Sequence, residues 1–150
     1  MKHANPWSVY TRTSALPILV IAIWSRVWFE WWSLILILLA IIWIWFNPRI
    51  FPEVKNTDNW ASRGVFGERV WLNRKEIPVP KHHRKMPNVL NAIQVIGVLF
   101  LICGLWYLDF WPTVVGLILA IESKLWYVDR MGCIYEDMKE ISEYKKWERK

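Results

Sequence analysis

The chain has 150 residues, enough for one domain, and it combines 55% hydrophobic residues and 13 tryptophans with a formal net charge of +6. Charged residues still make up 21%, but they lie between long apolar runs rather than within them. This segregation excludes an ordinary soluble domain and is typical of a protein whose helices cross a lipid bilayer.

Four apolar segments are long enough to cross the hydrocarbon layer, since a helix rises about 1.5 Å per residue and about 20 residues suffice. In chain order these predicted spans cover residues 7–24, 31–46, 89–108 and 111–128. Short connections join the first span to the second and the third to the fourth, so we expect two helical hairpins. The sequence therefore predicts a single all-α, multi-pass membrane domain over residues 1–150.

The two short connections are rich in aromatic residues: "WFEWWS" begins at Trp28 and "YLDFWP" begins at Tyr107. Tryptophan rings prefer the headgroup level of a membrane, and a carboxylate is tolerated there. The similar order of residues suggests two copies of one hairpin. The alternative is that any two hairpin tips at a membrane surface select the same residue types.

Lysine and arginine are distributed unevenly between the connections, and this predicts the orientation. The central loop, residues 47–88, carries Arg49, Lys55, Arg63, Arg69, Arg74, Lys75, Lys81, Arg84 and Lys85, and further basic residues lie in the tail, residues 129–150. The two hairpin tips hold only Arg26. Because basic residues stay on the cytoplasmic side, we expect the central loop, the tail and both termini in the cytoplasm of a prokaryotic cell.

Within the central loop, "TDNWASRGVFGERVWLNRK" predicts an amphipathic helix at the cytoplasmic membrane surface, capped by Thr57 or Asp58. Gly64 and Gly67 either weaken this helix or mark tight packing. The loop is a structural collar against the membrane or a surface for a partner. Candidate contacts to lipid or partner are Trp60, Arg63, Arg69, Trp71 and Trp147. Basic residues confined to membrane-proximal segments favour lipid headgroups over nucleic acid.

Glu122 is the acidic residue placed deepest in a predicted span, about 15 Å after Pro112. A lone carboxylate at that depth is costly, so we expect it to be buried among the polar residues Asn91, Gln94 and Arg12. Such a site either moves protons or polar ligands, or it only holds helices together. Gly116 and Ala120, four residues apart, predict close helix packing beside it.

The adjacent residues His82 and His83 are the strongest metal-binding candidates in the sequence. Pro78, Pro80 and Pro87 predict an extended path, in which neighbouring side chains point to opposite sides and do not share one ion. The nearby Lys81, Arg84 and Lys85 would also repel a cation. No metal site, cofactor or catalytic residue is therefore expected.

The strings "NPWSVYTR", "FNPRIFP", "NWASRGVFGERVWLNR" and "IPVPKHH" resemble those of an uncharacterised family of small prokaryotic four-helix integral membrane proteins, a domain of unknown function. The resemblance covers nearly the whole chain. It implies a four-helix membrane fold and no activity, so it assigns no catalytic residue.

These observations favour a non-catalytic integral subunit that scaffolds or stabilises a larger membrane complex, such as a respiratory or monooxygenase assembly. Its expected partners are membrane lipids and other integral membrane subunits. The alternative is a small oligomeric transporter or channel with a polar site at Glu122. A lesser alternative is a membrane enzyme that uses His82 or His83.

Overall fold

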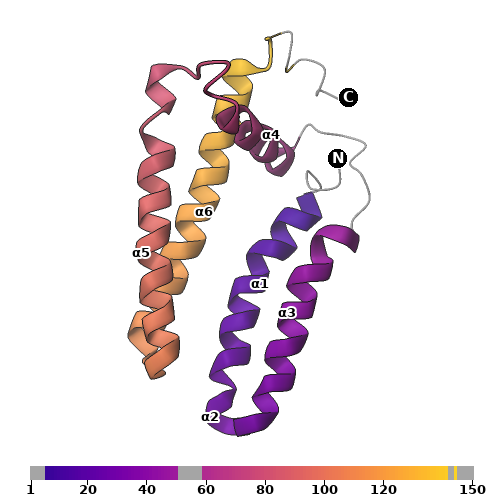
Figure 1. The fold of residues 1–150 in the computed structure, drawn as a ribbon, viewed down its shortest axis with the longest axis vertical. Coiled ribbons are helices and arrows are strands. Elements are labelled where there is room, and N and C mark those ends of the chain that lie inside the picture. The colour runs from indigo at the N-terminus through magenta and orange to yellow at the C-terminus, as the bar shows by residue number, and fades with distance from the viewer. Residues whose placement is uncertain (1–5, 51–58, 142–143, 145–150) are drawn as a thin grey trace.

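In a computed structural model of the chain, the described residues are 6–50, 59–141 and 144, and their regular structure is entirely helical (Figure 1). Side chains are described for these residues except 6–9, 12 and 48–50. The elements are α1 (Pro6–Trp24), α2 (Arg26–Phe29), η2 (Glu30–Trp32), α3 (Ser33–Ile50), α4 (Trp60–Leu72), η3 (Lys81–His83), α5 (Met86–Tyr107) and α6 (Phe110–Met138). The predicted all-α class is confirmed, and each predicted span coincides with a helix.

The helices form two pairs, α1 with α3 and α5 with α6, and α4 lies across α6 at one end of the molecule (Figure 1). The α1–α3 contact uses small and polar residues. On α3 the buried side chains are Ser33, Ala40 and Asn47, spaced by seven residues, and they lie against a face of α1 that includes Ala15 and Ala22. This spacing keeps one narrow stripe of α3 facing α1.

The α5–α6 pair is closely packed through glycines. A Cβ atom added to Gly97 would lie 2.8 Å from the amide nitrogen of Ala120, and one added to Gly104 or Gly116 would overlap the main chain of the opposite helix. Small residues at such positions let helix backbones approach, which is the main route to helix association in membranes. The close packing predicted from Gly116 and Ala120 is confirmed.

A compact hydrophobic core joins α4 to the last turns of α6. Phe66, Val70 and Trp71 of α4 pack with residues of α6 that include Met131 and Ile134, and Val79, Leu90 and Tyr144 also belong to the cluster. Gly67 lies directly against the main chain of Met131, so the glycines of α4 mark tight packing rather than a weak helix. The helix begins after Asn59, whose side chain accepts a hydrogen bond from the Ser62 amide at 2.9 Å. The predicted caps, Thr57 and Asp58, lie outside the described residues.

At the opposite end, large aromatic side chains are exposed on α2, on η2, on the last residues of α5 and on the first residues of α6. They are Trp28, Phe29, Trp31, Trp32, Trp106, Tyr107, Phe110 and Trp111. Arg26 links the two tips because its guanidinium donates to the main-chain oxygens of Leu105 and Trp106, at 2.6 and 3.1 Å. Those carbonyls belong to the last turn of α5, where a cation is favourable.

Two stretches, Thr13–Asn47 and Lys81–Tyr107, contain helices long and apolar enough to cross a membrane. Only 11% and 22% of the residues in their most apolar windows are buried within the chain. The core helix of a soluble protein would be mostly buried, so these helices present their apolar side chains to the surroundings. That all four long helices cross a membrane remains a prediction.

Candidate functional site

The polar site expected around Glu122 is not buried within the chain. The side chains of Glu122 and Asn91 are exposed, Gln94 is half-buried, and the side chain of Arg12 lies outside the described residues. The face of α6 turned toward α5 follows Gly116, Ala120 and Ser123. At about 100° per residue, Glu122 projects well to the side of that face, so the expectation of a buried carboxylate is wrong.

A buried polar contact occurs instead between α1 and α3. Asn47 is fully buried, and its Nδ2 donates to Oγ1 of Thr11 at 2.7 Å, while its Oδ1 has no hydrogen-bond partner. In the sequence Asn47 precedes Pro48 and indicates the end of a helix. The structure continues α3 through both residues to Ile50, which places the amide inside the helix pair.

The residues expected to contact lipid or a partner are largely engaged within the chain. Trp71 is buried in the core, which contradicts a surface role for it. Nε1 of Trp60 donates to Asp129 at 3.3 Å, and Arg63 pairs with Glu136 at 3.1 Å. Arg69 is half-buried, and Trp147 lies outside the described residues. The sequence predicted one helix for Trp60, Arg63, Arg69 and Trp71, but it could not show that this helix packs against α6.

His82 and His83 lie in the short helix η3, and this corrects the extended path predicted for them. The turn is held by hydrogen bonds from the His83 amide to the Pro80 oxygen, 3.1 Å, and from Nε of Arg84 to the Val79 oxygen, 3.0 Å. Because the backbone curls here, the two imidazole rings lie on the same side, with centroids 4.1 Å apart. Adjacent histidines can therefore face one group.

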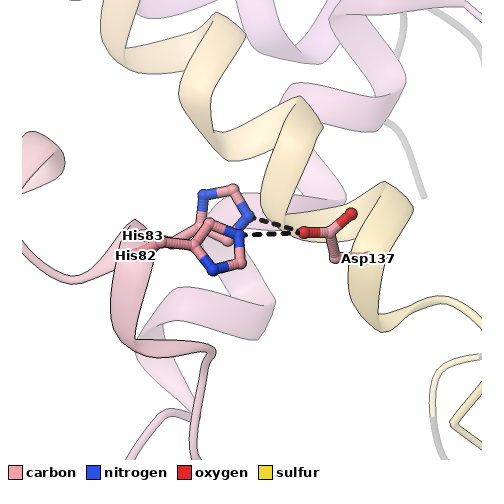
Figure 2. Close-up of side chains that lie close together, drawn as sticks. All are labelled: His82, His83 and Asp137. Carbon is pink, nitrogen blue, oxygen red and sulfur yellow. Dashed lines mark hydrogen bonds and ion pairs between the residues drawn. The ribbon is translucent and has the colours of Figure 1, made fainter.

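That group is Asp137 on α6 (Figure 2). Nε2 of His82 lies 3.3 Å from Oδ2 of Asp137, and Nε2 of His83 lies 2.8 Å from the same oxygen. The hydrogen bond from His83 lowers the pKa of the Asp137 carboxyl, partial desolvation opposes the shift, and the bond from His82 adds to it. The carboxylate is thus anionic at neutral pH and faces two nitrogen atoms.

Two of the three side chains, those of His83 and Asp137, line a cleft of about 520 Å³ between α4, η3 and α6. Its lining residues include two ion pairs: Arg63 with Glu136, and Arg130 with Asp129 at 3.0 Å. Cys133, a free and half-buried thiol one turn before Asp137, also lines it. The cleft therefore offers imidazole, carboxylate and thiol groups to a solute from water.

Comparison with known proteins identifies the family of this chain. It belongs to a family of unknown function, DUF6653, whose model matches residues 1–150. This confirms the resemblance noted in the sequence. No curated protein and no solved structure was found to match the chain.

Proposed function

We propose that this chain is an integral membrane protein that crosses the cytoplasmic membrane four times as two helical hairpins and acts as a non-catalytic subunit of a larger membrane complex. The apolar helix surface supports the membrane assignment. Leucine, isoleucine and tryptophan side chains cover the outward faces of α3 and α5. Burying so much apolar area in lipid is strongly favourable, at about 25 cal/mol per Å².

The ends of the helices support a transmembrane orientation. The exposed aromatic residues of both tips gather at one end of the molecule, where they suit the headgroup level. The opposite end holds α4, the ion pairs of the cleft and the exposed cations Arg74, Lys75 and Lys81. Basic residues next to spans favour the cytoplasmic side, so the proposal places α4, η3 and both termini there.

The main support for a role as a subunit is the large exposed surface of α3. This helix contributes only Ser33, Ala40 and Asn47 to the buried interior of the described chain. Leu38 and Ile42, one turn apart, are exposed and lie about 160° around the helix from Ala40. A membrane-spanning helix that contacts its own chain through only one narrow row of residues leaves most of its surface free. That surface can pack against membrane helices of another protein.

The experiment is purification of the full chain from its native host in mild detergent at native expression levels. We expect a particle that contains other integral membrane proteins, and its loss when Leu38 and Ile42 are both changed to alanine. Val95 and Leu99 on α5 are exposed, spaced alike and turned away from α6, so their double alanine variant is the matched control. A particle with no other protein, or loss in the control alone, contradicts the proposal.

A second candidate function follows from the exposure of Glu122. An unpartnered carboxylate on the lipid-facing side of a span is unfavourable by several kcal/mol, and an assembly of several copies would shield it. This favours a small oligomeric transporter or channel. The same purification separates the two: a particle made of several copies of this chain alone, disrupted by Glu122→Gln, supports the second function against the first.

A further inference from the structure

Three side chains from two segments distant in the sequence converge at the end of the fold that holds α4. His82 and His83 belong to η3, between α4 and α5, while Asp137 lies near the end of α6 (Figure 2). One potential ligand atom from each, two imidazole nitrogens and a carboxylate oxygen, all lie within 4.8 Å of one another. From this geometry we propose that His82, His83 and Asp137 form a binding site for a divalent transition metal of the zinc type.

The ligand set and its spacing fit such an ion. Imidazole nitrogen suits Zn²⁺, Cu²⁺ and Ni²⁺, and a carboxylate oxygen commonly completes a zinc site. Bonds of about 2.0–2.1 Å in a tetrahedron separate neighbouring ligand atoms by about 3.3 Å. The distance from Nε2 of His82 to Oδ2 of Asp137 is already 3.3 Å. The distance from Nε2 of His83 to the same oxygen is 2.8 Å, so the His83 side chain would have to move outward only slightly.

The site is open on one side. The side chains of His82 and Asp137 are 68% and 48% exposed, and that of His83 is 11% exposed. A metal ion can therefore enter from water, and a water molecule can occupy the fourth position. Closed structural zinc sites have four protein ligands, whereas three protein ligands leave a fourth position that water or another small ligand can occupy.

The cations near the site do not prevent binding. Arg63 and Lys139 both pair with Glu136, at 3.1 and 2.6 Å, and Arg130 pairs with Asp129. With Asp137 included, these three cations face three carboxylates, so the charges around the site balance. The side chains of Lys81, Arg84 and Lys85 are exposed, and solvent screens their charges. A bound ion would connect η3 to α6 and so fix the entry of α5 relative to the core formed with α4. This inference does not depend on the proposed function.

The test uses the full-length chain in detergent, without a histidine tag and stripped of metal, titrated with ZnCl₂ against a chromophoric chelator. We expect one high-affinity Zn²⁺ per chain. Loss of groups that only orient a ligand weakens metal sites by about 10–100-fold, so Asp137→Asn and His83→Ala should each weaken binding by at least about 100-fold. His82→Ala, at an exposed position, provides a third variant in which the fold is retained.

Matched controls separate this site from adventitious binding. Glu76→Gln removes an exposed carboxylate that does not line the cleft, and His3→Ala removes the third histidine of the chain; both should keep wild-type affinity. Helicity measured by circular dichroism checks that each variant folds. The visible spectrum of bound Co²⁺ shows whether coordination is tetrahedral and whether Cys133 takes part. Absence of stoichiometric binding, or binding that survives Asp137→Asn and His82→Ala, overturns the proposal.

Discussion

Gly67 and Gly132 both lie where α4 crosses α6, but they differ in the space that a side chain would find. A methyl group on Gly67 would overlap the main-chain carbonyl of Met131, which cannot move without displacing the helix. A methyl group on Gly132 would meet only the Cβ of Arg63 and the amide nitrogen of Gly64, both at 3.9 Å. The close contact between α4 and α6 therefore requires a glycine at position 67 but not at position 132.

We therefore predict opposite effects of two identical substitutions. Gly67→Ala should lower the free energy of unfolding by about 1–3 kcal/mol, because backbone must shift to admit the methyl group. Gly132→Ala should be neutral or raise it by up to about 1 kcal/mol, since alanine has less backbone freedom to lose in a helix. Thermal unfolding followed by circular dichroism in detergent measures both. Equal destabilisation would show that the α4–α6 contact differs from the one described.

The α1–α3 pair and the α5–α6 pair are connected at both ends of the molecule. Along the length between these ends, few residues of one pair contact the other. At the tip end, Arg26 donates to the last carbonyls of α5. At the other end, Tyr10 of α1 stacks on Trp60 of α4, with ring centroids 6.4 Å apart. Arg26 therefore has two roles, since it caps a helix and connects the pairs.

Arg26→Gln should loosen the end of α5. We expect faster hydrogen exchange of the amides from Leu105 to Asp109. The free energy of unfolding should fall by about 1 kcal/mol, because hydrogen bonds from a half-buried cation contribute modestly. Glu30→Gln changes a charge at the same tip without touching α5, and it is the control. Unchanged exchange in Arg26→Gln, measured by mass spectrometry, would mean that the cap does not hold α5.

Helix positions were predictable from the sequence because each depends on local hydrophobicity, and Gly116 with Ala120 even indicated a packing face. Three features depend on contacts between distant residues and were not predictable. A tryptophan such as Trp71 suits a membrane surface as well as a protein core. Trp71 is in the core only because α6 packs against it. Likewise, the turn at His82 and His83 and its approach to Asp137 join segments more than fifty residues apart. The exposure of Glu122 depends on which stripe of α6 faces α5.

For the molecule as a whole, the type of exposed side chain changes from one end to the other. Exposed aromatic residues mark one end, apolar helices form the middle, and the core around α4 with its ion pairs forms the other end. In water the exposed helix faces would drive aggregation, whereas in a bilayer they are solvated by lipid tails. The four-span topology that we propose rests on this division and on the positions of the basic residues.

Labelling of single cysteines tests this topology most directly. In a chain with Cys103 and Cys133 replaced by serine, cysteine is introduced at Glu30, at Asp109 or at Lys75, all three exposed. A membrane-impermeant maleimide applied to intact cells should label the chains with cysteine at positions 30 and 109. It should label position 75 only after the cells are lysed. Labelling of position 75 in intact cells, or of positions 30 and 109 only after lysis, would contradict the four-span account.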